Sequence, residues 1–227
     1  MTDTGISARE AIASRRSVRG FLSTPVSRET VEDILALAAR APSGSNIQPW
    51  HVYVCSGAAR RQVSDAINAA YAAGGEGHEE EYHYYPKQWR EPYLGRRRTL
   101  GKALYGHLGI PKEDKEGMRR HFGRNYDFFG APVGLFFTLD RDMEPGSWLD
   151  LGMFMQNIMI AARSHGLHTC PQQAFHQFRQ IIGPIMGIPD SQMLVCGMAL
   201  GYEDPTEPAN KLETERAAVS EFARFVE

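Results

Sequence analysis

The chain has little cysteine, no long apolar run and no excess of either charge, and each shortage excludes a class of protein. Its 227 residues include only three cysteines, Cys55, Cys170 and Cys196, so neither a disulfide framework nor a zinc knuckle is expected. No stretch approaches the roughly 20 apolar residues that span a bilayer, so we expect no membrane partner. The 25 basic and 27 acidic residues nearly balance, which argues against general nucleic-acid binding.

Familiar catalytic signatures are missing as well. There is no Gly-x-Ser-x-Gly elbow and no Walker A loop, and the glycines of residues 74–77 do not fit the dinucleotide-binding pattern. His165, His168 and His176 have no carboxylate between them, and the His-Glu-x-x-His pattern of a zinc site is absent. We therefore expect no bound metal. Cys170 is better read as a small buried residue than as a nucleophile. The N-terminus lacks the pattern of a signal peptide, and we expect a cytoplasmic protein.

What is present is a series of helical and strand patterns typical of one α+β domain over residues 1–227. Ser7 and Glu10 form a capping box that predicts a helix ending near Arg15. Residues 76–130 have no clean period and many aromatics, so we expect an inserted, partly mobile segment. Further helices are expected from Ser27 to before Pro42, over 58–73, from a cap at Ser147 to 163, over 217–225, and near 96–107 and 112–124. Strands are expected over 50–55, 133–139 and 192–200.

A cluster of cations follows the first predicted helix. Arg15, Arg16 and Arg19 stand within five positions, together with the hydroxyl of Ser17. Guanidinium forks bind multiply charged oxyanions through paired hydrogen bonds. Basic residues also favour the negative end of a helix dipole, which explains one or two arginines. Three arginines beside a serine favour an anion site.

Two polar segments complete the candidate site. Residues 42–50 are rich in small residues and amides, and Asn46 and Gln48 offer the donors and acceptors that a flat heterocycle requires. The alternative is that residues 42–50 only end the preceding helix, as small polar residues often do. Residues 166–173 would place a backbone N–H or an amide of Gln172 or Gln173 against a ring, although by themselves they favour a plain polar loop. An anion site beside an amide-rich loop indicates a phosphorylated aromatic cofactor.

These motifs resemble a known family. Residues 15–21 and 42–50 together look like the signature of the FMN-dependent nitroreductase superfamily, and the likeness extends over nearly the whole chain. Within that family the chain is most similar to the bacterial nitrobenzene and nitrobenzoate reductases. The resemblance implies a central, mainly antiparallel sheet flanked by helices. It also implies an intertwined homodimer with FMN at each of two interface clefts and NADPH or NADH as electron donor.

The resemblance also implies which residues hold FMN. Its phosphate, ribityl chain and pyrimidine oxygens would be contacted by basic and hydroxyl side chains: Arg15, Arg16, Ser17, Arg19 and, from near the C-terminus, Arg216. The flavin would be lined, from the partner chain, by Pro42, Ser43, Ser45 and Asn46, with Gln48 a weaker candidate. Its N5 edge would be approached by Pro171, Gln172 and Gln173.

The implied reaction is the reduction of nitroaromatic compounds to hydroxylamino products by hydride transfer through flavin N5, with no catalytic side chain. The inserted segment, residues 76–130, would act as a lid that contacts the substrate. The alternative is that it only covers the dimer. The aromatic candidates for those contacts are Tyr82, Tyr85, Trp89, Tyr126 and Phe128. Alternative functions are an FMN reductase of quinones, enones or halogenated phenols, and a non-catalytic FMN-binding protein.

Overall fold

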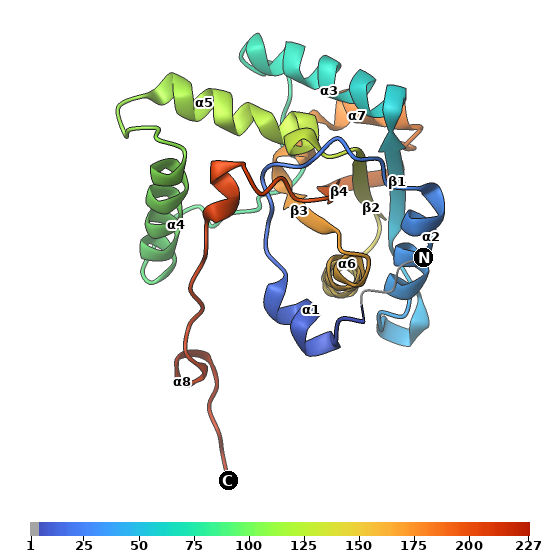
Figure 1. Ribbon diagram of the computed structural model, residues 1–227. Helices are drawn as coiled ribbons and strands as arrows, with labels where there is room; N and C mark the ends of the chain where they lie inside the picture. The colour runs from blue at the N-terminus through green and yellow to red at the C-terminus, as the bar shows by residue number, and fades with distance from the viewer. Residues whose placement is uncertain (1–4) are drawn as a thin grey trace.

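The computed structural model describes residues 5–227, in which a four-stranded antiparallel sheet lies between layers of helices (Figure 1). The order in the sheet is β1-β2-β4-β3. β2 and β4 take the two central places because they are near-continuous apolar runs that are buried along their length. The expected α+β class and antiparallel sheet are confirmed. The strands are β1 (His51–Ser56), β2 (Val133–Asp140), β3 (His168–Gln172) and β4 (Gln192–Gly201).

One face of the sheet is covered by α2 and the 20-residue α6, and α1 packs on α6. Leu151, Phe154 and Ile158 of α6 recur at helical spacing and are buried against β2 and β4. The opposite side of the same helix exposes Leu149 and Met153. α6 is therefore apolar on more of its circumference than one sheet covers. The helices of this layer are α1 (Ala8–Ser14), α2 (Arg28–Ala38) and α6 (Pro145–Ser164).

The other face carries a second, aromatic core. Phe136 of β2 meets Phe175 edge to face, with ring centroids 5.2 Å apart, and Tyr126 packs on Phe175 in the same way at 5.9 Å. All three rings are fully buried. The elements of this layer are α3 (Gly57–Ala72), α7 (Arg179–Met186) and the 3-10 helices η2 (Arg124–Gly130) and η3 (Gln173–Phe178).

Two parts of the chain lie outside this layered body. α4 (Tyr93–His107) and α5 (Lys115–Gly123) stand to one side of the sheet (Figure 1). After η4 (Pro208–Lys211) the chain leaves the body and runs away from it as an arm that includes α8 (Val219–Phe222) (Figure 1). Among the helices of residues 5–227, none is both long and apolar enough to cross a membrane.

Several sequence expectations need correction. The cap of α6 is Glu144, not Ser147, because Pro145 has the backbone angle that suits a first helical position. The helix expected over 217–225 shrinks to the four residues of α8, since a short helix without packing is marginal. The segment around Pro171, favoured as a loop, forms edge strand β3. α7 was not expected at all.

Candidate functional site

The segment that follows α1 carries the arginine cluster on extended backbone. Arg15 has φ −64° and ψ 125°, and Ser17 forms a parallel bridge with β3. Successive side chains of an extended chain point to opposite sides. Arg15, Ser17 and Arg19 therefore share one side, and Arg16 and Val18 take the other. Val18 is fully buried, which fixes the direction of the whole segment.

The thiol of Cys170, in β3, identifies what faces the first side. Burial raises the pKa of Cys170 to about 11, while the charge of Arg19, a hydrogen bond with Ser17 and the charge of Arg15 act in the opposite direction. The three side chains that influence the thiol are the three that the alternation places together. With this pKa the thiol stays protonated near neutral pH, which fits a buried structural cysteine and not a nucleophile.

Positive charge on this side has no counter-ion. Among the ion pairs of residues 5–227, none involves Arg15, Arg19 or Arg216. Burial lowers the pKa of Arg15, and the nearby charge of Arg216 lowers it further. Arg19 donates to the carbonyl of Ser17 over 3.3 Å. Guanidinium groups gathered in this way form a field that favours a multiply charged anion.

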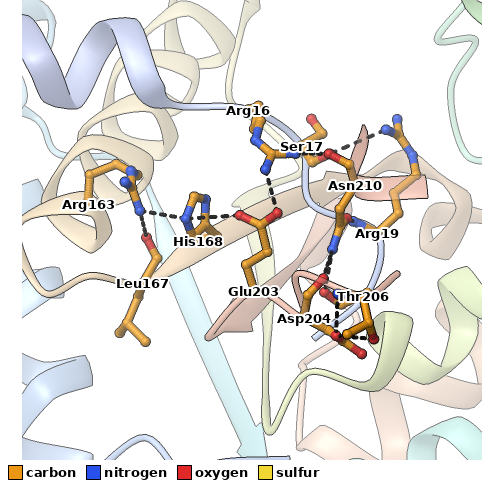
Figure 2. Close-up of polar contacts among 11 residues, drawn as sticks. Arg16, Ser17, Arg19, Arg163, Leu167, His168, Glu203, Asp204, Thr206 and Asn210 are labelled. Carbon is orange, nitrogen blue, oxygen red and sulfur yellow. Dashed lines mark hydrogen bonds and ion pairs between the residues drawn. The ribbon is translucent and has the colours of Figure 1, made fainter. Parts of the chain in front are cut away.

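Arg16 lies apart from this group. Figure 2 shows its guanidinium against the carboxylate of Glu203. Its Nη2 donates to Glu203 and its Nη1 to the main-chain carbonyl of Asn210. The structure thus brings together Arg15, Ser17 and Arg19 but turns Arg16 toward the segment that follows β4.

Asn210 clasps the backbone of the arginine segment. Its Oδ1 accepts from the N–H of Arg19 over 2.7 Å, and its Nδ2 donates to the carbonyls of Gly20 and Asp204 over 2.8 and 2.9 Å. The side chain is buried, so these bonds are shielded from water. Sequence reasoning assigned no role to Asn210 or to Glu203. Partners nearly 200 positions apart leave no local signal.

The amide-rich loop has an unusual backbone. It contains the 3-10 turn η1 (Gly44–Asn46), and Ser45, Asn46 and Gln48 have φ of 48°, 59° and 49°. Left-handed residues other than glycine cost energy and cluster at functional sites. Side-chain oxygens help to hold the loop: Gly44 N–H donates to Asp150 Oδ2 over 3.2 Å, and Gln48 N–H donates to the Ser43 hydroxyl over 2.9 Å.

This loop does not join the arginine segment within one chain. Pro42, Ser45, Asn46 and Gln48 are exposed. No hydrogen bond or ion pair described for residues 5–227 connects residues 42–50 to the arginine cluster. The loop therefore presents polar groups at the surface, where a second molecule has access to them.

The two glutamines after Pro171 use their amides internally. Gln172 is 2% exposed and its Nε2 donates to the carbonyl of Asn125 over 2.7 Å, while its Oε1 is buried without a partner. Gln173 donates through Nε2 to the Tyr82 hydroxyl and to the carbonyl of Val195. Any contact from this segment to a bound ring is therefore left to its backbone.

The aromatic candidates separate into two groups. Tyr126 and Phe128 are fully buried in the second core, so the expectation that they contact substrate is wrong: no surface is left for a ligand. They belong to η2, so the end of the 76–130 segment is core and not lid. Tyr85 and Trp89 line an open hollow of about 490 Å³ before α4. Tyr82 is half-buried against Trp148.

The three histidines that were considered as metal ligands lie beside charged side chains of the protein. His165 lies 3.0 Å from Asp33 and His176 lies 3.0 Å from Glu80. Burial, followed by the charge of Arg163, lowers the pKa of His168 to about 4. Within residues 5–227, no three His, Cys, Asp or Glu side chains are grouped as a metal site requires.

Comparison with known proteins adds a family and named relatives. Residues 12–202 match the family described as the nitroreductase family. The chain is 43% identical, over 96% of both sequences, to a nitrobenzene nitroreductase of Ectopseudomonas oleovorans. It is 40% identical to a 4-nitrobenzoate reductase of Pseudomonas putida, over 95% of this chain and 93% of the relative.

Solved structures agree with the sequence comparison. An FMN and NADPH-dependent nitroreductase NfnB from sphigopyxis sp. strain HMH superposes with a TM-score of 0.95 at 40% identity, over 98% of this chain and 100% of the other. The FMN-dependent nitroreductase NfnB from Mycobacterium smegmatis, in complex with NADPH, gives 0.92 at 31% identity, over 97% and 98%.

Proposed function

Because the chain belongs to the nitroreductase family, we propose that it binds FMN and uses NADPH or NADH to reduce nitroaromatic compounds to hydroxylamino products. The relatives named for nitrobenzene and 4-nitrobenzoate support the substrate class, and the NfnB structures support the cofactor and the electron donor. The observation that carries the proposal is the group of guanidiniums without a counter-ion, which suits the phosphate of FMN.

The residues present fit FMN. Arg15, Arg19 and Arg216 would hold the phosphate, because they converge from two parts of the chain and have no carboxylate of their own. Ser17 shares their side and would donate its hydroxyl. FMN, when bound, supplies hydride transfer at its N5 atom.

The side chains of this protein would orient the cofactor and set the charge around it. Arginines held on a rigid edge of the sheet cost little reorganisation and favour negative charge on the group they bind. The backbone of Pro171, Gln172 and Gln173 would face the ring edge, since both amide side chains are turned inward. We assign no acid or base. Burial raises the pKa of Cys170 to about 11 and that of Cys196 to about 12, so neither thiol ionises near neutral pH.

We further propose that two copies form the complete site. The arm exposes Phe222 and Phe225, which are 72% and 81% accessible, and α6 exposes Leu149 at 72%. Large exposed apolar groups that lie close together, as Phe222 and Phe225 do along the arm, mark interaction sites. A second copy would cover them. Its amide-rich loop (residues 42–50), called the strained loop below for its left-handed backbone, would bring Pro42, Ser43, Ser45, Asn46 and Gln48 to the flavin.

A visible spectrum followed by an anaerobic titration tests this function. The purified protein, with FMN added, is titrated with NADPH and separately with NADH, and then with nitrobenzene or 4-nitrobenzoate or, in a parallel sample, with a quinone. Flavin bands that bleach and then return on addition of the nitroarene support the proposal. Bands that bleach and stay bleached indicate a binding protein or a different acceptor, and bands that return only with a quinone indicate a quinone reductase. A protein that binds no FMN contradicts the proposal entirely.

A further inference from the structure

We propose that Arg16 and Glu203 form an internal brace that positions the FMN-binding arginines, and that Arg16 itself does not contact the FMN phosphate. This inference rests on the proposed function and divides the arginine cluster into two roles. Arg15 and Arg19 would bind, and Arg16 would hold their backbone in place.

The guanidinium of Arg16 already donates hydrogen bonds within the protein. Two terminal nitrogens of Arg16 donate to two different oxygens, a carboxylate of Glu203 and the carbonyl of Asn210. The forked, bidentate grip that makes arginine a good phosphate ligand needs a pair of such N–H groups on one side. To grip a phosphate, Arg16 would first have to leave Glu203 with its charge half-buried and unpaired, since that side chain is 18% exposed.

Glu203 depends on Arg16 for its hydrogen bond. His168 Nε2 lies 3.4 Å from the other carboxylate oxygen and 2.7 Å from Nη1 of Arg163 (Figure 2). An arginine only donates, so Nε2 is the accepting nitrogen of a neutral imidazole and has no proton to offer Glu203. The lowered pKa of His168 agrees with the neutral form. Arg16 is thus the group that donates to this carboxylate.

Backbone alternation separates the two roles. Arg15, Ser17 and Arg19 share the side that faces Cys170, whereas Arg16 shares its side with the buried Val18. A single extended segment cannot turn adjacent side chains to the same side. The held Arg16 and the buried Val18 therefore together fix the side to which Arg15 and Arg19 project.

The segment is also fastened on both flanks. Val18 N–H donates to Thr169 of β3 over 3.1 Å, and the N–H of Leu22 donates to Tyr202 over 2.9 Å. Asn210 bonds the backbone at Arg19 from the opposite direction, and Figure 2 shows this clasp beside the Arg16–Glu203 pair. The brace thus belongs to a rigid frame that leaves the other two arginines free to act on a ligand.

The test compares affinity for FMN with affinity for riboflavin, which lacks the phosphate. Dissociation constants are measured by flavin fluorescence for the wild type, for Arg15→Met, for Glu203→Gln, and for the double variant Arg16→Met/Glu203→Gln. The double variant removes both charges of the brace at once, so that neither is left unpaired. Thermal unfolding of each variant checks that it is folded.

We expect Arg15→Met to lower the ratio of FMN to riboflavin affinity by about tenfold or more. The double variant should change that ratio by less than about threefold, even if both affinities fall together, because a brace acts on the whole site. Glu203→Gln should weaken both flavins alike.

A double variant whose ratio falls as far as that of Arg15→Met would show that Arg16 binds the phosphate and would overturn the brace. So would a Glu203→Gln variant with raised FMN affinity, since Glu203 would then compete with the phosphate for Arg16. Failure of the wild type to bind either flavin is a different result, because it removes the proposed function and not only the brace.

Discussion

Trp50 lies flat against Phe154, with ring centroids 4.7 Å apart and planes inclined by 6°. Trp50 stands between the strained loop and β1, and Phe154 belongs to the buried side of α6. α6 also provides Asp150, which accepts the N–H of Gly44. One helix thus holds both ends of a loop whose backbone is left-handed at three places, and the stack is an anchor for that loop.

We expect Trp50→Leu to lower the free energy of unfolding by about 1–3 kcal/mol, because it removes a stacked ring pair and leaves space beside Phe154. The matched control is Trp50→Phe, which keeps an aromatic ring and should lose less. Chemical denaturation at one fixed protein concentration measures both. Equal losses in the two variants would show that the stacking itself contributes nothing.

Arg216 provides the second prediction, since its charge already lowers the pKa of Arg15. Arg216→Ala should weaken FMN binding about tenfold and leave riboflavin binding nearly unchanged, as expected for a charge-assisted bond to phosphate. The control is Arg224→Ala, which removes an exposed arginine from the same arm. If the two variants bind FMN equally well, Arg216 is not a phosphate ligand.

The apolar arm leads to a third prediction, that Phe222→Asp weakens the proposed dimer. An exposed phenylalanine that becomes buried between two copies contributes several kcal/mol in favourable cases, and a carboxylate there adds a desolvation cost. Sedimentation over a range of concentrations measures the effect. Ser220→Asp adds the same charge to the same arm and should change association far less. A wild type that sediments as a monomer at every concentration would contradict the assembly.

The fourth prediction concerns pH. Burial lowers the pKa of His121 and of His168 to about 4 in the folded protein, from an ordinary 6.5. Between pH 4 and pH 6.5 the two histidines bind protons in the unfolded chain but stay neutral in the folded chain. The free energy of unfolding is therefore highest above about pH 6.5 and falls as the pH drops toward 4. Each histidine accounts for a loss of about 1–3 kcal/mol.

Urea denaturation at about pH 7.5 and about pH 5 measures this dependence. His121→Leu removes one titrating group and should show a smaller difference between the two conditions. A wild type whose midpoint is the same at both pH values would mean that the two histidines are accessible to protons in the folded state.

Most elements could be read from local patterns, because a helix of eleven or more residues repeats its apolar positions several times. α3 was predicted within one residue at each end, α2 began where it was expected but ended at Ala38 and not just before Pro42, and β2 began where it was expected, at Val133. Errors occurred where the local signal is weak. Ser147 looked like a cap, but Pro145 starts the helix earlier, and β3 looked like a loop because Pro171 and two glutamines stand where apolar residues usually mark a strand.

The site shows the same division. The arginine cluster and the strained loop were found from residue type and spacing alone. The aromatic candidates were not separable in this way, because Tyr126 and Tyr85 look alike in a sequence and only packing buries one and exposes the other.

The sequence by itself determined the chemistry that is available: guanidiniums in one short segment, amides in another, and helices and strands enough for one layered domain. Only the tertiary structure decided which arginine meets which partner. Arg16 differs from Arg15 and Arg19 because an extended backbone alternates its sides and because Glu203, 187 positions away, lies on one of them. Contacts between residues so far apart in the sequence form because the sheet brings β3, β4 and the arginine segment together. A local sequence pattern contains no information about them.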